Sequence, residues 1–278
     1  MHNCVNGGVM NTHELGTHNR LIEELCDFAV DPRHAEYVPP APLPGSRQEQ
    51  NELDEILLLS KCRDIPALMT STWPSLQRHT LSYLLPPMQT GRDLARFLGQ
   101  RFTIPLYRTI FNQQLVDLSL PPETWFTMQT CLDLSMRIAL MFMQRYQQRC
   151  MQLGLTYERP RPFELDDTLV PLMDALMFGL LARCSVIAGA ASEVAAMFLP
   201  QQREGWEHLA DNIGMARLWA GVHYRSEHIH GLRLGRIIAG RLPLPIPITS
   251  GAAQAVTVEL GIRELGIREL GIRMPIAA

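Results

Sequence analysis

The chain has 278 residues, of which 46% are hydrophobic and 19% are charged, so it can bury a substantial core and is too apolar for a disordered protein. Its formal net charge of -3 excludes an overall positive field for binding nucleic acid. The first residues lack the cationic and apolar regions of a signal peptide, and the 6 cysteines include no CxxC pair, so we expect a cytoplasmic protein.

Residues 1–50 are expected to form an amino-terminal arm. One helix is predicted within it, from His18 to about Val30. The segment from Tyr37 to Gly45 is rich in proline, which lacks an amide donor and resists both helix and sheet. We therefore predict that the second half of the arm is an extended linker.

Helical periodicity dominates the chain from Glu52 onward. After a first amphipathic segment, residues 91–102 and 106–118 have the spacing of two more helices. The clearest prediction is a long helix that starts at Pro121-Pro122-Glu123-Thr124 and runs to about Met151, because proline is favoured early in a helix and glycine, here Gly154, just after its end.

Three further helical regions, 169–199, 201–219 and 224–241, follow a proline-containing loop at 158–162. No alternating pattern of useful length indicates a strand before the last of these ends. The predicted fold class is therefore all-α, a large bundle of roughly eight to ten helices, in a domain that spans residues 51–241.

Residues 169–199 form the longest apolar stretch of the chain. Asp174, Arg183 and Glu193 interrupt it, and each charge would cost about 2.5 kcal/mol or more at the centre of a bilayer. We predict a helix buried in the protein core and expect no membrane span.

Residues 242–278 are expected to be a carboxyl-terminal tail. Residues 259–273 are three copies of Glu-Leu-Gly-Ile-Arg. A period of five matches neither helix nor strand, and each copy carries a glycine that weakens a helix. Solenoid units need about 20 residues or more, so we predict a tail or a partner-contact segment. A second copy of the chain, in a homodimer, is one partner that such a segment could contact.

Arg159, Arg161, Arg217 and His223 are the residues best suited to chemistry. Arg161 stands in the loop after the long helix, before a proline that stops the next turn and leaves the guanidinium able to reach a ligand. Glu227 follows His223 at i+4, so its carboxylate can hold one ring nitrogen and leave the other for a ligand. Two guanidinium groups and an oriented imidazole predict a site for a tetrahedral oxyanion.

Two other interpretations compete with an oxyanion site. Arginines after loops are commonly solvated or paired on the surface, and a helical His/Glu pair is commonly structural. Glu227 and His230 also form an E-x-x-H element, but di-iron bundles need two such elements. His223 and His230 would lie about 10 Å apart along a helix, too far to share one ion, so no metal site is predicted.

The stretch 217–231 resembles the last signature of the vanadium-dependent haloperoxidase and type-2 phosphatidic acid phosphatase superfamily, in which R-x5-H-x3-D precedes a glycine-containing helix. The segment 157–163 is similar to the end of the family's first signature, K-x6-R-P. The resemblance implies the large helical bundle of the vanadium haloperoxidase and acid phosphatase fold.

The resemblance also implies roles for individual residues. Arg161 and Arg217 would bind phosphate or vanadate. His223 would attack phosphorus or ligate vanadium, with Glu227 at the position of the family aspartate.

The chain departs from the family at two of its catalytic positions. The family lysine would fall at Gly154, and Lys61 is the only lysine in the sequence. The middle signature, P-S-G-H, should supply an acid/base histidine and a serine, but the chain has no histidine between residues 80 and 207. The best placement retains only its glycine, as Gly179, and Arg159 or Arg183 would be the groups able to replace the lysine charge.

We therefore expect a divergent enzyme on a haloperoxidase-like and acid-phosphatase-like scaffold, with a remodelled oxyanion pocket for a small anionic organic substrate of specialised metabolism. Arg161, Arg217 and Arg183 would hold the anionic group, and His223 would act as base or nucleophile. A general acid typically contributes about 10² to 10⁴ in rate, so halide oxidation should be negligible. No cofactor is expected, although vanadate or phosphate would suit the pocket. The alternative is a non-catalytic binding or assembly protein on the same scaffold.

Overall fold

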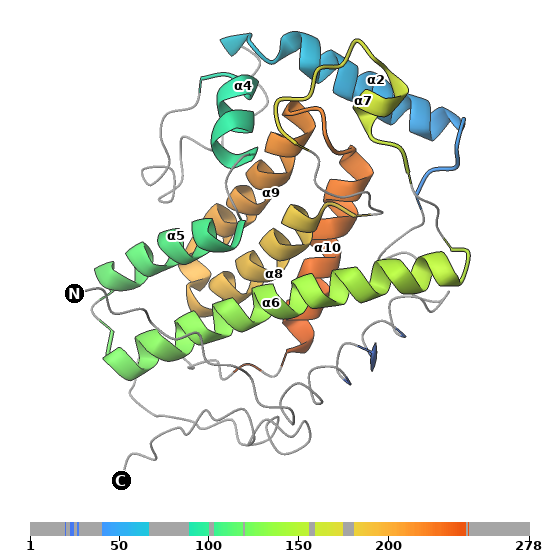
Figure 1. Ribbon diagram of the computed structural model, residues 1–278. Helices are drawn as coiled ribbons and strands as arrows, with labels where there is room; N and C mark the ends of the chain where they lie inside the picture. Colours follow the sequence, from blue (N-terminus) through green and yellow to red (C-terminus); the bar gives the residue numbers. More distant parts are fainter. Residues whose placement is uncertain are drawn as a thin grey trace, which may run out of the picture.

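The computed structural model describes residues 41–66, 89–99, 103–118, 120–155, 159–174 and 181–242, with a few single positions outside these ranges (Figure 1). All regular structure within them is helical, which confirms the predicted all-α class. Most of the predicted arm helix, Gly179 and nearly all of the tail lie outside the described residues.

The helices match the predicted segments closely. In chain order they are α2 (Arg47–Cys62), α4 (Gly91–Leu94), the π-helix η3 (Ala95–Gly99), α5 (Thr103–Asp117), α6 (Pro122–Gln152), α7 (Pro162–Leu165), α8 (Arg183–Phe198), the 3₁₀ turn η4 (Pro200–Gln202), α9 (Arg203–Trp219) and α10 (Arg225–Arg241). None of them is long and apolar enough to cross a membrane.

Two boundaries differ from the sequence-based expectation. Helix α2 begins inside the predicted arm, because the hydroxyl of Ser46 accepts a hydrogen bond from the Glu49 amide and caps the helix. Residues 169–174, predicted as helical, form an irregular segment instead. There the Leu172 amide donates to the carbonyl of Ala220, a contact distant in sequence that replaces a helical hydrogen bond.

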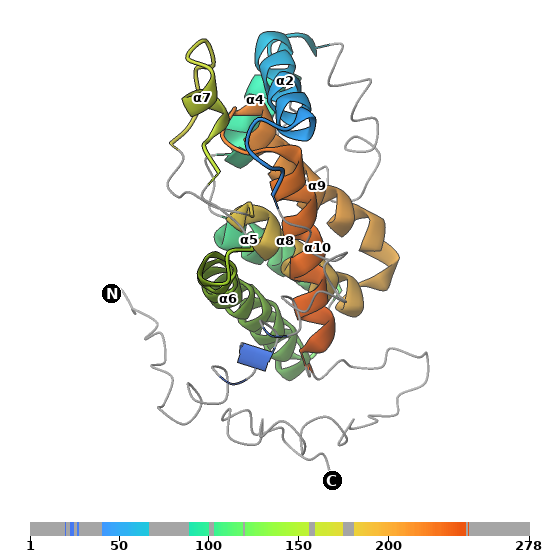
Figure 2. The same cartoon turned by 90° about the vertical axis from the view of Figure 1, so that its right-hand side faces the viewer.

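Helices α8, α9 and α10 form the centre of the bundle, and α5 and α6 lie along one side of it (Figures 1 and 2). Nearly every side chain of α8 is buried, as its long apolar run predicts. Helices α2, α4 and α7 lie together at the end of the bundle where α9 ends and α10 begins.

Glycines bring α8 and α10 into backbone contact. A Cβ atom on Gly189 would lie 2.3 Å from the carbonyl oxygen of Leu232, and one on Gly235 would lie 2.1 Å from that of Val186. The two helix axes can approach this closely only because these positions lack side chains. The contact fixes the middle of α10 against α8.

We predict that Gly235→Ala destabilises the protein by about 1 to 3 kcal/mol, because the added methyl group would force the two helices apart. Gly240→Ala, on the same helix, is the matched control, since a Cβ atom there meets nothing within 4 Å. Alanine is the better helix former, so the control should be neutral or slightly stabilising. Urea unfolding measures both, and equal effects would contradict the close-packing argument.

Candidate functional site

Three segments meet at the end of the bundle that carries α2, α4 and α7. Arg161 directly precedes α7, Arg217 lies in the last turn of α9, and Glu227 lies in the first turn of α10. His223 stands in the short connection between α9 and α10. That connection turns sharply at Gly221, whose φ of 77° favours glycine over any residue with a Cβ atom.

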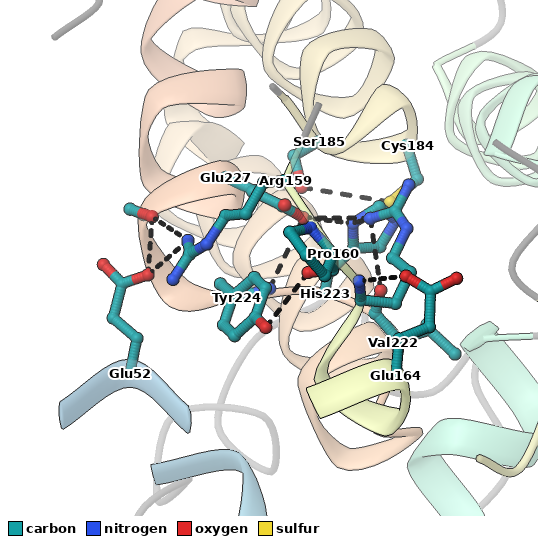
Figure 3. A network of polar contacts seen from close by, with 12 residues as sticks. Glu52, Arg159, Pro160, Glu164, Cys184, Ser185, Val222, His223, Tyr224 and Glu227 are labelled. Carbon is teal, nitrogen blue, oxygen red and sulfur yellow. Dashed lines mark hydrogen bonds and ion pairs between the residues drawn. The ribbon is translucent and has the colours of Figure 1, made fainter. Parts of the chain in front are cut away.

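The carboxylate of Glu227 is the common partner of His223 and Arg161 (Figure 3). Its Oε2 lies 2.6 Å from His223 Nδ1 and accepts a hydrogen bond of 3.2 Å from Arg161 Nη1. The amide of Tyr224 also donates to Oε2, at 3.4 Å. The side chains of Arg161 and Glu227 are only 4% and 2% exposed, so this is an ion pair inside the protein.

The contacts determine how the imidazole of His223 is used. Arg161 Nη1 lies 2.9 Å from Nδ1 and 3.3 Å from the carbonyl oxygen of Val222. Because Nη1 can only donate, we assign the Nδ1 hydrogen to the bond with Glu227 and the Nη1 hydrogens to Glu227 and Val222. Among the described residues none hydrogen bonds Nε2, and the His223 side chain is 15% exposed. Its Nε2 therefore carries a lone pair that no described residue uses.

The surroundings of His223 keep the imidazole neutral. Burial lowers its pKa below the ordinary value of 6.5, and the positive charges of Arg161 and Arg217 lower it further. The hydrogen bond and charge of Glu227 oppose this shift without cancelling it. A neutral imidazole at pH 7 can accept a proton or attack an electrophile.

The guanidinium of Arg217 has donors that the protein leaves unsatisfied. Its Nη1 points to the sulfur of Met173 at 3.2 Å, and a thioether is a weak acceptor. Its Nε is buried without a hydrogen-bond partner among the described residues, and so is Nε of Arg161. Buried N–H groups of this kind are what an oxyanion would satisfy.

Arg159 does not lie with His223, Glu227 and Arg161. Its Nη1 lies 2.6 Å from Glu52 Oε2 and 3.3 Å from the hydroxyl of Ser226, and its guanidinium carbon lies 3.4 Å from the centre of the Tyr224 ring. Figure 3 shows it turned toward Glu52 and away from His223. Arg159 is 1% exposed and connects α2 to the start of α10, so its contacts are structural.

The other groups expected to replace the family lysine are not gathered around Glu227 either. Arg183 is the first residue of α8, is exposed and has no hydrogen-bond or ion-pair partner among the described residues. Lys61 is exposed near the end of α2, where its charge acts on Asp166. Two arginines therefore supply the positive charge beside His223.

A second buried histidine was missed by sequence reasoning. His228 Nδ1 lies 2.9 Å from the hydroxyl of Ser185, and Nε2 lies 2.9 Å from Oδ1 of Asp211. Its ring lies against Gly214, where a Cβ atom would come within 1.8 Å. His228 thus connects α10 to α8 and α9, directly beside Glu227. No local pattern indicates this arrangement, because His228, Ser185 and Asp211 lie in three different helices.

The described residues contain no group of three or more His, Cys, Asp or Glu side chains arranged to hold a metal ion. Glu227, the first member of the E-x-x-H element, is paired with Arg161. Burial and the charge of Arg233 lower the pKa of His230, the last member, to about 4.

Comparisons with known proteins bear on the fold. No protein-family model matches the chain, and no curated protein matches it. Among solved structures the chain is similar to the first bacterial vanadium-dependent iodoperoxidase, with 18% identity and a TM-score of 0.50. The match covers 74% of this chain and 52% of the iodoperoxidase chain, so this chain spans about half the length of that protein. The similarity shows that the chain has the helical fold of the vanadium haloperoxidases, as the two signatures predict.

We predict that Glu52→Gln destabilises the protein by about 2 to 4 kcal/mol, because it leaves the buried Arg159 without its closest carboxylate. Glu49, at 3.9 Å from Arg159, compensates only in part. Asp64→Asn is the control, since it breaks an ion pair with Arg92 in which the aspartate is 61% exposed, and it should destabilise the protein far less. Comparable losses in denaturant unfolding would contradict a structural role for Arg159.

We predict that His223 takes up a proton only below pH 6.5, its ordinary pKa. Glu227→Gln should lower this pKa further, because it removes the one charge that raises it. NMR titration of the histidine ring signals, assigned with His223→Gln, measures both values. Because the pKa of His223 is lower in the folded protein than in the unfolded chain, the unfolded chain binds the proton more readily. His223 therefore lowers the free energy of unfolding as the pH falls below 6.5. A measured His223 pKa above 6.5 would contradict the conclusion that its surroundings keep the imidazole neutral.

Proposed function

We propose that the chain is a divergent enzyme on a haloperoxidase-like and phosphatase-like scaffold, whose remodelled site holds the anionic group of a small organic substrate. The observation that supports this most strongly is the orientation of His223. Glu227 engages Nδ1 at 2.6 Å, which leaves Nε2 of a neutral, 15% exposed side chain without a hydrogen-bond partner among the described residues. Arg217 lies close enough for its charge to lower the pKa of His223.

The anionic group of the substrate would be held mainly by Arg217. Arg161 contributes charge and its unpaired Nε, but its Nη1 is engaged by Glu227. Each charge-assisted hydrogen bond to such an anion is worth about 1.5 to 3 kcal/mol. Two guanidinium groups are therefore sufficient for binding in the micromolar to millimolar range once the cost of ordering the ligand is subtracted.

His223 fits the role of general base better than that of nucleophile. A base needs only the neutral imidazole, which takes a proton from the substrate at Nε2 while Glu227 stabilises the resulting imidazolium through Nδ1. Attack on phosphorus would also require an acid to protonate the leaving group, and the chain has no histidine between residues 80 and 207 to supply it.

Vanadate has the same tetrahedral shape as phosphate, and the unpaired Nε atoms of Arg161 and Arg217 suit either ion. His223 would face it through Nε2. When bound, vanadate would supply a Lewis-acid centre. The proposed reaction uses only residues of the chain and does not depend on vanadate.

A second candidate is a non-catalytic binding or assembly protein on the same scaffold. It is favoured by the pairing of Arg161 with Glu227, which are 4% and 2% exposed and stabilise the meeting point of α7 and α10. Residues that once served chemistry would then be retained for folding alone.

Binding of inorganic phosphate separates the two candidates. We expect phosphate to raise the melting temperature saturably at millimolar concentration, because a ligand of the folded state stabilises it by mass action. Arg217→Gln should abolish the shift, and His223→Gln should leave most of it. Arg203→Gln, at the opposite end of α9 in an exposed pair with Glu193, should behave as wild type.

Absence of any phosphate-dependent shift in the wild type would remove the anion site from consideration. If the shift is present, screening of small organic phosphates and carboxylates tests for turnover. An enzyme should lose turnover in His223→Gln while it still binds phosphate, whereas a binding protein should retain its ligand with no conversion by either form.

A further inference from the structure

The segment that follows α7 is fixed across the end of α9. The Leu172 amide donates to the carbonyl of Ala220 at 2.9 Å, and Leu169 packs against Gly221. At the other side of the segment, Arg63 of α2 donates to the carbonyl of Val170 at 3.1 Å. The position of the next side chain, Met173, is therefore set by contacts with both α2 and α9.

Met173 places its sulfur between Arg217 and η3. Its Sδ lies 3.2 Å from Arg217 Nη1 and would lie 3.3 Å from a Cβ atom on Gly99. The Met173 and Arg217 side chains are both partly exposed, and the sulfur covers the guanidinium at Nη1.

The contact between Arg217 and Met173 joins a strong hydrogen-bond donor to a weak acceptor. A guanidinium is a charged donor that binds carboxylate or phosphate strongly, whereas a thioether is uncharged and accepts weakly. Asp174, the neighbouring carboxylate, is exposed and has no hydrogen bond or ion pair with Arg217. Arg217 Nε has no partner among the described residues. The protein thus covers the charge of Arg217 without neutralising it.

We propose that Met173 is the specificity-determining residue of the anion site. Its sulfur occupies the place on Arg217 Nη1 that an oxygen of the ligand would take, and the flexible, unbranched side chain moves aside when a charged oxyanion binds. Displaced in this way, the side chain packs on the apolar part of the ligand. The site therefore selects a substrate that combines a carboxylate or phosphate group with an adjacent apolar body. This inference rests on the proposed function.

Two substitutions test the role of Met173 in opposite directions. Met173→Ala removes the competing sulfur and should lower the phosphate Kd several-fold. Met173→Gln places a strong acceptor against Arg217 and should raise the Kd at least tenfold. Met215→Ala is the matched control, because Met215 Sδ lies 3.4 Å from Arg225 Nη1, a second arginine–methionine contact. It should leave the Kd, measured by calorimetry with inorganic phosphate, unchanged.

A second readout does not depend on a ligand. Phenylglyoxal modifies accessible arginines, and peptide mass spectrometry resolves the rate at Arg217. We expect a several-fold faster rate in Met173→Ala and a slower one in Met173→Gln, with circular dichroism confirming that each variant is folded. An unchanged rate at Arg217 in Met173→Ala would overturn the role of Met173, even if phosphate binds. If Met173 controls the rate but neither the wild type nor a variant binds phosphate, the proposed anion site is wrong instead.

Discussion

The carboxylate of Glu227 is the constraint around which this end of the molecule is arranged. A carboxylate that is 2% exposed has lost its water and must be paired within the protein. Its partners come from the segment before α7, from His223 in the connection between α9 and α10, and from the amide of Tyr224, the N-cap of α10. Satisfying one buried charge therefore brings together the arginine and the histidine on which any chemistry depends, and it also fixes the tautomer of that histidine.

Arg159 and Arg161 are separated by one proline and serve different purposes. Arg159 is bound to Glu52 and covers the Tyr224 ring, while the Tyr224 hydroxyl donates to the carbonyl of Pro160 at 3.1 Å. Arg161 turns to the other side, toward Glu227. One arginine thus connects α2 to the bundle and the other enters the site. Two identical side chains thus reach different parts of the structure, and the proline between them limits the backbone.

The fold is that of the vanadium haloperoxidases, but the distribution of charge near His223 is this chain's own. Two guanidinium groups provide the positive charge, one of them committed to Glu227 and the other covered by the sulfur of Met173. Both lower the pKa of His223, and the imidazole is consequently neutral. A neutral base beside a partly covered cation is suited to binding an organic anion and removing a proton from it, and it requires no second acid group.

The sequence by itself determined the helices and one local pair. Periodicity placed α6, α9 and α10 almost to the residue, because it depends on neighbours along one helix. The i, i+4 spacing of His223 and Glu227 also predicted their contact, although His223 lies in the connection just before α10. Only the tertiary structure decided the direction of Arg159, the exposure of Arg183, the cover of Met173 on Arg217 and the burial of His228 between three helices. Those arrangements depend on packing between segments far apart in the chain, which no local pattern records.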